Sequence, residues 1–409
     1  MFNAVFGEKI FCGLDLGSAR FKASALKLRR GADFEFLGVH ECPAGGFKNS
    51  SPTNLNDFVE AIQSTLGGLM KKTGVRLKNL QVGLGGDLIG NRLSQAVIPL
   101  IEKGSKVITL GDVQKVVREA RLLGLKIEEE LLHEFPQSYQ IDGINRASNP
   151  LGLYGRKLEV ELLLIAAHAT PLTNIMKAVH QAGYEAANLY WTSYAASWTS
   201  LTPKIKTGGG ALVDVGSSTT DVLIFKAGIL RHTQKIPLGG ESVTNRMAQN
   251  LGLTFDVAEA MKKNYNVVLN GDQRKEEDIL IKNERGYLPL KRQAIDESLE
   301  PAIEELVSHI EKVIKGPFYH QLNGGLIMVG GGSLLSGFLE MIERATSLPV
   351  GMGTIQIPHT ALNPAVFSPA VGLAMLGSQK VLSFVADTPP AHWLENLRDR
   401  LKELYQDYF

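Results

Sequence analysis

The sequence predicts an α/β fold in which two related lobes face each other across one binding site. Near the start, an apolar strand, Asp15 and Gly17, and a returning strand form a hairpin pattern. The same pattern recurs about half a chain later around Asp214 and Gly216. A third observation is a late run of glycines at 330–332, between an apolar strand and a predicted helix. Any one of these features is weak, but the three in this order are specific.

Each hairpin turn has the composition of a phosphate-binding loop. Glycine and serine let the backbone approach an anion closely and direct N–H groups towards it. Carboxylates repel phosphate, so Asp214 and Asp221 are useful there only with a divalent cation or a water between. In the first copy, Lys22 adds a cation that can reach a phosphate. A plain hairpin with a polar turn is the alternative, and the recurrence of the pattern weighs against it.

The late glycine run completes the predicted site. An apolar strand at 326–329 leads into the glycines, and residues 334–345 read as a helix. A strand, three glycines and a helix start form a surface on which an adenosine can lie and backbone amides can meet a phosphate.

With these motifs, the chain resembles the actin, heat-shock chaperone and sugar-kinase superfamily of ATP-binding folds. Within it, the sequence is most similar to the FtsA family of bacterial cell-division proteins. The segments that carry this likeness are 135–142, 149–153, 230–233 and 367–373. The resemblance covers nearly the whole chain. It implies an α/β, actin-like (ribonuclease H-like), two-lobed ATPase fold with an FtsA-type inserted subdomain and a C-terminal amphipathic helix.

The resemblance also implies a division of the chain into segments. The expected segments are 1–80, first part of core lobe 1; 81–162, the inserted subdomain; 163–200, lobe 1 continued; 201–235, first part of core lobe 2; 236–300, a small ATP-facing subdomain of lobe 2; 301–358, lobe 2 continued; 359–380, a return to lobe 1; 381–391, a linker; and 392–409, a membrane-targeting helix.

Composition excludes several classes of protein. The 409 residues suggest two to four compact units, and a net charge of +1 gives no electrostatic basis for nucleic-acid binding. The two cysteines, Cys12 and Cys42, do not form a disulfide framework, which favours a reducing cytoplasm. No signal peptide and no apolar run of the length of a membrane span is present, so we expect any membrane contact to be peripheral.

The resemblance implies that the cofactors are ATP and Mg²⁺, with Asp15 and Asp214 orienting the hydrated metal through water. The residues expected to bind ATP are Asp15, Gly17, Ser18, Ala19, Lys22, Asp214, Gly216, Ser217, Ser218, Thr219, Asp221, Gly240, Glu241, Asn245, Arg292, Gly330, Gly331, Gly332 and Ser333.

Two of these assignments have alternatives. Glu241 and Asn245 are expected to approach the ribose, but Glu241 could equally be an acid in the first turn of its helix. In the chaperone relatives a Lys-Arg pair stacks on adenine, and Arg292 matches it, since a planar guanidinium lies flat on a base. In the FtsA family the same small lobe, 236–300, docks the C-terminal tail of FtsZ, so Arg292 could serve either contact.

The C-terminal residues predict an amphipathic helix. Its apolar face suits the edge of a bilayer, with mixed charges on the polar face that give little attraction to anionic lipid. A helix docked on its own domain or on a neighbour is the alternative. The residues expected to enter the membrane are Trp393, Leu394, Leu397, Leu401, Leu404 and Phe409.

The function implied by the resemblance is an ATP-binding protein that polymerises on the cytoplasmic face of the inner membrane at the division septum. It would anchor FtsZ filaments (the Z-ring) and help recruit later division proteins. A PilM-like cytoplasmic scaffold of a type IV pilus machine is the alternative, and a sugar kinase is a third. The stretch 189–201, which we expect to form a hinge helix, lacks the Asp, Glu or Gln that often activates water. We therefore expect ATP binding with at most weak hydrolysis, and assign no catalytic residue.

Overall fold

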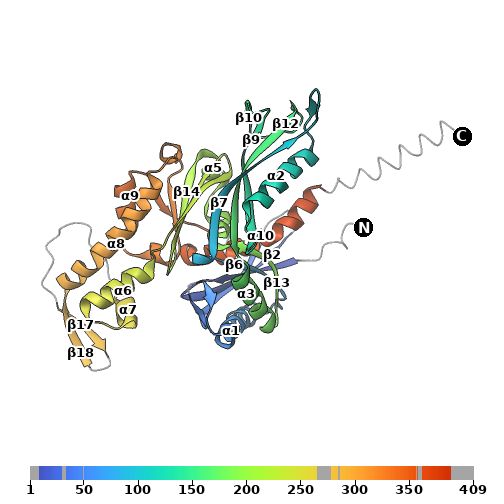
Figure 1. Ribbon diagram of the computed structural model, residues 1–409. Coiled ribbons are helices and arrows are strands. Elements are labelled where there is room, and N and C mark those ends of the chain that lie inside the picture. Colours follow the sequence, from blue (N-terminus) through green and yellow to red (C-terminus); the bar gives the residue numbers. More distant parts are fainter. Residues whose placement is uncertain are drawn as a thin grey trace.

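The computed structural model describes residues 9–29, 34–48, 50–264, 278–283, 286–355, 357 and 362–387. These residues form two lobes and an inserted subdomain that projects from the first lobe (Figure 1). The six residues predicted to contact a membrane, between Trp393 and Phe409, lie outside the described residues.

The first lobe is built on a five-stranded sheet with the first hairpin near its centre. In spatial order its strands are β13 (Glu185–Trp191), β6 (Asn79–Leu84), β1 (Lys9–Leu16), β2 (Arg20–Leu28) and β3 (Phe34–Pro43). β1 runs antiparallel to β2 and parallel to β6. Helices α1 (Leu55–Thr73) and α3 (Ala169–Gln181) pack on one face, and the short strands β4 (Phe47–Lys48) and β5 (Ser51–Pro52) precede α1.

Helix α1 shows why these residues form this element. The Asn54 side chain accepts hydrogen bonds from the backbone N–H groups of Asn56 and Asp57, which satisfies two donors at the helix start. The helix ends at Gly74, whose φ of 71° suits glycine. Its apolar residues recur at helical spacing and are buried against the sheet: Phe58, Ile62, Leu66 and Leu69.

The second lobe repeats the topology of the first. Its strands, in spatial order, are β16 (Ile229–Ile236), β15 (Thr220–Lys226), β14 (Gly210–Val215), β19 (Leu326–Val329) and β20 (Val350–Met352). As in lobe 1, the strand carrying the aspartate, β14, runs antiparallel to its hairpin partner and parallel to the next strand. The remaining elements of this lobe are α5 (Pro203–Gly208), α6 (Gly240–Leu251), α7 (Phe255–Asn264), β17 (Asp278–Asn283), β18 (Gly286–Lys291), α8 (Arg292–Ile314), η3 (Tyr319–Gln321), η4 (Gly331–Leu334) and α9 (Phe338–Thr346).

Two helices lie between the sheets. Helices α4 (Thr192–Ser200) and α10 (Pro364–Asp387) pack on each other and contact strands of both lobes. Small residues allow this close packing, because a Cβ on Gly372 would lie 1.9 Å from the carbonyl oxygen of Ala195. The helix predicted over 189–201 was wrong at its start, since residues 189–191 are the last strand residues of β13. Strand pairing with β6 overrides the helical pattern there.

Helix α10 also runs further than predicted. It continues to Asp387, through the first part of the stretch 381–391 that we expected to be a linker. No proline interrupts this stretch before Pro389, and the residue ahead of a proline is disfavoured in a helix. The helix can therefore extend to just before the proline pair.

The insert is a separate four-stranded sheet with its own core. Its strands, in spatial order, are β10 (Asn145–Ala147), β9 (Glu129–Ile141), β12 (Lys157–His168) and β7 (Ile89–Pro99). Helix α2 (Leu110–Gly124) packs on β7 and β12, and Thr109 caps its start. The turn η2 (Gly86–Leu88) leads into the insert, and β8 (Lys106–Val107) pairs with β11 (Tyr154–Gly155).

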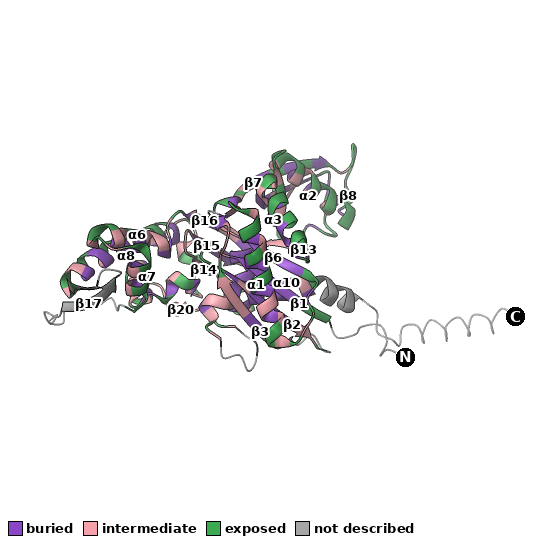
Figure 2. Cartoon of the chain, turned by 90° about the horizontal axis from the view of Figure 1, so that it is seen from below, coloured by how far each residue is buried: buried purple, intermediate pink, exposed green. Residues whose placement is uncertain are grey.

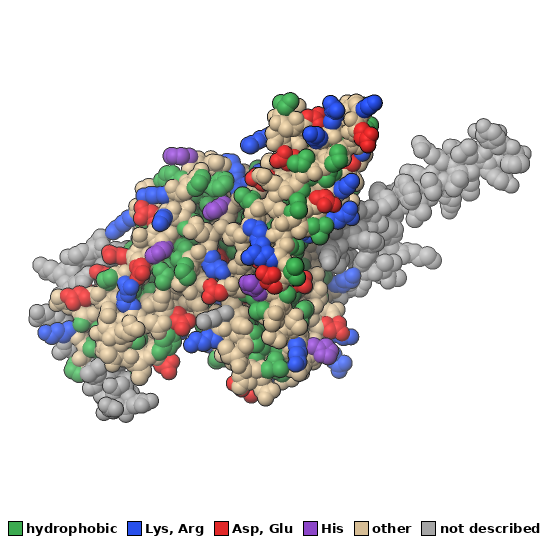
Figure 3. Space-filling view, in the orientation of Figure 1, with side chains coloured by type: hydrophobic (Ala, Val, Ile, Leu, Met, Phe, Trp, Pro, Cys, Tyr) green, Lys and Arg blue, Asp and Glu red, His purple; other side chains and the backbone are tan. Residues whose placement is uncertain are grey.

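Burial follows this layered arrangement. Buried residues concentrate in the sheets and on the helix faces turned towards them (Figure 2). One core runs from lobe 1 across the interface to Leu212 and Phe225 of lobe 2, so the lobes are joined by apolar packing. On the face shown in Figure 3, basic and acidic side chains are interspersed. None of the described helices combines the length and hydropathy that a bilayer span requires.

Candidate functional site

A cleft of about 520 Å³ lies between the two lobes, where the two hairpin turns face each other. The glycine turn after β19 and residues of α6 and α7 complete its walls. The predicted site residues that line it are Asp15, Gly17, Ser18, Ala19, Lys22, Asp214, Gly216, Ser217, Ser218, Thr219, Asp221, Gly240, Gly330, Gly331 and Gly332. Folding thus brings together segments that are up to about 300 residues apart in the sequence.

Four predicted residues do not line the cleft. Ser333 is buried, and its hydroxyl donates to the carbonyl oxygen of Gly330 at 2.7 Å, which braces the glycine turn from beneath. Glu241 and Asn245 lie on α6, and Glu241 accepts a hydrogen bond of 3.4 Å from the Ser218 hydroxyl. Arg292 is the first residue of α8. Direct contacts of these residues with a ligand remain predictions.

The two hairpin turns need glycine at equivalent places. A Cβ on Gly17 would lie 2.8 Å from the carbonyl oxygen of Arg20, and a Cβ on Gly216 would lie 2.9 Å from that of Thr219. Both contacts are closer than Cβ atoms tolerate. The tight turns therefore require the glycine two residues after each aspartate, as the repeated pattern predicts.

The third glycine segment is held against the second hairpin. Gly330 has a φ of 85°, in the left-handed region, and a Cβ there would lie 2.6 Å from Oδ1 of Asp214. Any side chain at 330 would displace this carboxylate. Gly331 has no neighbouring atom in the direction of its missing side chain, so its backbone is open to an incoming group.

The start of α6 is bonded to the second hairpin turn. The backbone N–H of Gly240 donates to the carbonyl oxygen of Gly216 at 3.0 Å, and that of Glu241 donates to Ser217 at 2.8 Å. Gly239 permits this approach, since a Cβ there would lie 2.5 Å from the Ser217 carbonyl oxygen. The turn and the helix start therefore behave as one rigid wall.

The carboxylates on the cleft floor differ in their partners. Asp15 forms an ion pair with Lys22, with 3.6 Å between Oδ2 and Nζ. Burial raises the pKa of Asp15, and the Lys22 charge opposes that shift. Burial and the nearby carboxylates of Asp221 and Asp15 together raise the pKa of Asp214 to about 7, while the Ser193 hydroxyl and the Lys22 charge oppose the shift. The lobe 2 side of the floor thus holds a carboxyl group that a nearby cation would help to ionise.

These carboxylates fit a hydrated metal better than an all-protein metal site. Within the described residues, no three His, Cys, Asp or Glu side chains gather as a metal-binding group. Mg²⁺ commonly uses one or two carboxylates, several waters and phosphate oxygens. Asp15 and Asp214 approach from opposite lobes and match that pattern.

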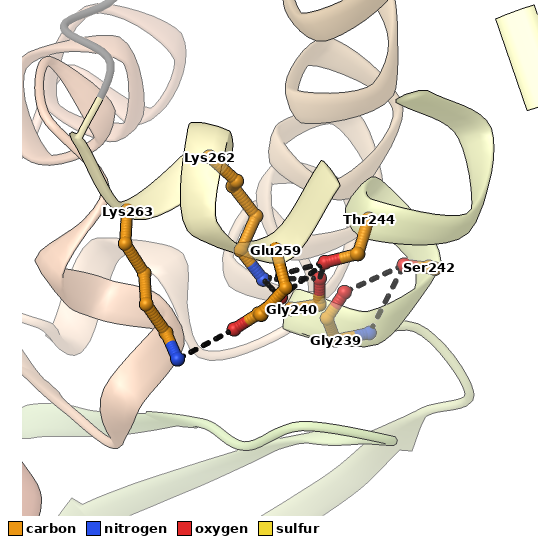
Figure 4. A network of polar contacts seen from close by, with 7 residues as sticks. All are labelled: Gly239, Gly240, Ser242, Thr244, Glu259, Lys262 and Lys263. Atoms are coloured by element: carbon orange, nitrogen blue, oxygen red, sulfur yellow. Dashed lines mark hydrogen bonds and ion pairs between the residues drawn. The ribbon is translucent and has the colours of Figure 1, made fainter. Parts of the chain in front are cut away.

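A polar network beside the cleft was not predicted (Figure 4). The Lys262 ammonium on α7 donates to the carbonyl oxygen of Gly240 and to the Thr244 hydroxyl, both at 2.8 Å. Glu259 pairs with Lys262 at 2.6 Å and with Lys263 at 3.1 Å. The network fixes α7 to the start of α6. Its only sequence signal is a glutamate three residues before a lysine in a helix, which is common on helix surfaces.

Two further residues were missed as site residues. Ser193 and Trp191 both donate hydrogen bonds to the Asp221 carboxylate. Neither residue is among those that the sequence analysis expects to bind ATP. No local pattern marks either residue, because their partner is about 30 residues away on the other lobe.

Comparisons with known proteins agree with this architecture. The family model described as "Cell division protein FtsA" matches residues 211–372, and the model described as "SHS2 domain inserted in FTSA" matches residues 87–166. Cell division protein FtsA of Pseudomonas aeruginosa is 28% identical over 97% of this chain and 98% of its own length.

Solved structures share the fold at low sequence identity. PilM in a PilM–PilN type IV pilus biogenesis complex has a TM-score of 0.64 at 17% identity, covering 90% of this chain and 98% of that chain. MreB5 of Spiroplasma citri bound to ADP has a TM-score of 0.54 at 11% identity, covering 93% of this chain and 99% of that chain.

The two similar lobes, the cleft between them and the inserted sheet define an actin-like α/β fold with the insert characteristic of one bacterial group. The two family models match separate segments that together make up more than half of the chain, and the similarity to the Pseudomonas protein extends over nearly all of it. The chain belongs to the FtsA family of bacterial cell-division proteins.

Proposed function

We propose that the cleft binds ATP together with Mg²⁺, and that the bound nucleotide holds the two lobes in a closed arrangement. The observation that carries this proposal is the meeting of two glycine turns and two aspartates, one from each lobe, on one cleft floor. The related fold of MreB5 was solved with ADP, which supports a nucleotide as the ligand. A ligand that binds only the closed form shifts the lobes towards closure.

Individual residues have distinct tasks in this proposal. Backbone amides of the turns around Gly17 and Gly216 hold the phosphates, and Lys22 contributes positive charge on the lobe 1 side. Asp15 and Asp214 orient the waters of the hydrated cation. When bound, Mg²⁺ would neutralise phosphate charge and favour the ionised form of the Asp214 carboxyl group.

Hydrolysis is expected to be weak. The start of α4 and the end of β13, which border the Asp221 side of the cleft, carry Trp191, Thr192 and Ser193 rather than a second carboxylate or a glutamine. Asp221 itself already accepts two hydrogen bonds from this segment. Nucleotide state would then act mainly through binding and lobe arrangement.

In the cell, the chain would polymerise on the cytoplasmic face of the inner membrane at the division septum. The segment 236–300 would dock the FtsZ tail, the insert would contribute to contacts with other subunits and with later division proteins, and the terminal helix would bind the bilayer. Membership of the FtsA family supports these roles. The likeness to PilM shows a shared fold at 17% identity and lends the pilus scaffold no further support.

Calorimetric titration of the full chain with Mg·ATP tests nucleotide binding. We expect saturable uptake with one ATP per chain, and stronger uptake with Mg²⁺ than with EDTA. A folded chain that takes up no ATP in either condition would overturn the proposal.

Liposome co-sedimentation tests the membrane role separately. The full chain and a chain that ends at Ala391 are compared with vesicles, in the presence of ATP. We expect only the full chain to pellet. Equal pelleting of both chains would remove the assignment of residues 392–409 to the membrane while leaving the nucleotide proposal intact.

A further inference from the structure

Two hydrogen bonds cross from lobe 1 to a buried carboxylate of lobe 2. Asp221 lies on β15 and is only 6% exposed. Its Oδ2 accepts a hydrogen bond of 2.7 Å from the Ser193 hydroxyl and one of 3.2 Å from Nε1 of Trp191. Both bonds reach the same oxygen, and Asp221 also lines the cleft. The carboxylate is therefore anchored from lobe 1, in a residue that also lines the cleft.

Trp191 is itself fixed from the insert. Its side chain is 2% exposed, and its backbone N–H donates to Nε2 of His133 on β9 at 3.0 Å. Burial lowers the pKa of His133 to about 3, so the ring is neutral and Nε2 can accept this bond. The indole thus has its backbone held by the insert and its side chain bonded to the other lobe.

A small cavity of about 10 Å³ lies behind Asp221. That is about the space needed for one water molecule, and a buried water is stable only with polar partners. The residues around it come from the insert, from β13 and from lobe 2: Ile89, Asn91, Ile165, Trp191, Asp221, Thr233 and Lys235. Asp221 is the point at which the cleft, the insert and both lobes meet.

We propose that Trp191 and Ser193 are positioning residues for Asp221. They hold its carboxylate across the lobe interface in one orientation, with Oδ2 occupied. Asp221 would then help to hold the hydrated cation that accompanies the nucleotide. The inference rests on the proposed function, since it requires a metal nucleotide in the cleft. Trp191 and Ser193 lie outside the hairpin turns and the glycine run, so the inference adds two residues to the site.

A purely structural role makes a different prediction. If the two hydrogen bonds only stabilise the fold, their loss should lower the affinity of the cleft for every ligand to the same extent. If they orient Asp221 towards the cation, their loss should lower the affinity for Mg·ATP and leave the affinity for a metal-free ligand unchanged. Comparing Mg·ATP with ADP in EDTA therefore separates the two roles.

The experiment uses the full chain and four variants. Trp191→Phe keeps an aromatic ring and removes the indole N–H, Ser193→Ala removes the hydroxyl, and Ser193→Thr retains it. Trp198→Phe is the matched control, because Trp198 lies on the same segment but donates no hydrogen bond to the Asp221 carboxylate. We expect Trp191→Phe and Ser193→Ala each to weaken Mg·ATP binding about tenfold, as for loss of a hydrogen bond to a charged group. Trp191→Phe is the specific test of Asp221, because Ser193 also interacts with the Asp214 carboxylate. The affinity of these two variants for ADP without metal should change less than about twofold. Ser193→Thr should bind Mg·ATP nearly as tightly as the native chain does.

Nuclear magnetic resonance of the nucleotide-free chain provides an independent readout. The indole N–H signal of Trp191, assigned by its absence in Trp191→Phe, should shift in Ser193→Ala and in Asp221→Asn but not in Trp198→Phe. A signal that ignores both substitutions would overturn the inference even if ATP binds. Equal weakening of Mg·ATP and metal-free ADP would overturn it as well.

Failure of the proposed function gives a distinct result. If the native chain takes up neither ligand while the indole signal still responds to Asp221→Asn, nucleotide binding is overturned. The positioning role falls with it, and the bonds between the lobes remain as structure alone.

Discussion

The two Asp-Gly hairpins share a backbone but differ in the charge placed opposite the aspartate. In lobe 1, the strand register sets Asp15 directly across from Lys22. In lobe 2, the same register sets Asp214 across from Asp221. The strand orders around the hairpins correspond, and both turns exclude a Cβ at the same glycine position. The two hairpins therefore share their backbone geometry, but the residue opposite the aspartate is a lysine in lobe 1 and an aspartate in lobe 2.

The different residues opposite Asp15 and Asp214 give the two aspartates different electrostatic surroundings. The lobe 1 aspartate forms an ion pair with its own strand neighbour, whose charge opposes the rise in pKa that burial causes. The lobe 2 aspartate faces a second acid, and burial with that neighbour raises its pKa to about 7. A cation that approaches the cleft therefore gains most from lobe 2. The comparison teaches that a repeated hairpin can place a cation opposite the aspartate in one lobe and a second acid opposite it in the other.

The largest expected effect comes from removing the lobe 2 aspartate. Asp214→Asn should weaken Mg·ATP binding about a hundredfold, the size of about 3 kcal/mol for a lost charged contact. Calorimetry measures it, with Asp57→Asn on the exposed start of α1 as the matched control. If Asp15→Asn has a far larger effect than Asp214→Asn, the division of labour between the lobes is wrong.

The pH dependence of binding sharpens the same point. With a pKa of about 7, Asp214 is mostly protonated at pH 6 and mostly ionised at pH 8. Mg·ATP affinity should therefore fall about tenfold from pH 8 to pH 6, and Asp214→Asn should weaken this dependence, although burial also raises the pKa values of Asp15 and Asp221. Titrations at several pH values check it. An unchanged pH profile in the variant would show that another group titrates.

The same shift predicts an effect on stability. The pKa of Asp214 rises from 3.8 to about 7 on folding, so the folded chain binds more protons between these values. The free energy of unfolding should then decrease as pH rises from about 4 to 7, by up to about 1.4 kcal/mol per pH unit. Urea denaturation of the nucleotide-free chain, relative to Asp214→Asn, isolates this contribution. If the free energy of unfolding of the native chain, relative to that of Asp214→Asn, rises with pH, the upward shift of the Asp214 pKa is contradicted.

Replacing the residue opposite each aspartate should affect the stability of the fold differently in the two lobes. Lys22→Met leaves Asp15 buried without its cation and should lower the free energy of unfolding by about 2 kcal/mol. Asp221→Asn relieves repulsion with Asp214, and its side-chain oxygen can still accept bonds from Trp191 and Ser193. It should leave stability unchanged within about 1 kcal/mol or raise it. Urea denaturation at pH 8 measures both, and similar losses in the two variants would contradict the comparison.

The smallest effect is expected in the lobe 2 turn. Neither Ser217 nor Ser218 in this turn is among the described residues with positive φ. Their conformations thus do not require glycine. Ser218→Gly should change Mg·ATP affinity less than about threefold and lower the free energy of unfolding by about 0.5–1 kcal/mol, through the more flexible unfolded chain. A loss of tenfold or more would mean that the serine hydroxyl itself contacts the ligand.

Local patterns predicted much of the fold and the floor of the cleft. In α1, a cap at each end, Asn54 and Gly74, sets the limits of a helix whose apolar residues recur at helical spacing. The start of α4 was misjudged because Leu189, Tyr190 and Trp191 are recruited as strand partners of β6. Pairing with a strand about a hundred residues away leaves no mark on the local sequence.

By itself, the amino-acid sequence determined the two hairpins, the glycine turn and the family. These features depend on residues within a few positions of one another, where glycine conformation and strand alternation act locally. Only the tertiary structure decided that Lys262 joins α7 to α6, and that Trp191 and Ser193 reach the carboxylate of the opposite lobe. Burial and the approach of like charges likewise set the pKa of Asp214, because both arise only when distant segments pack together.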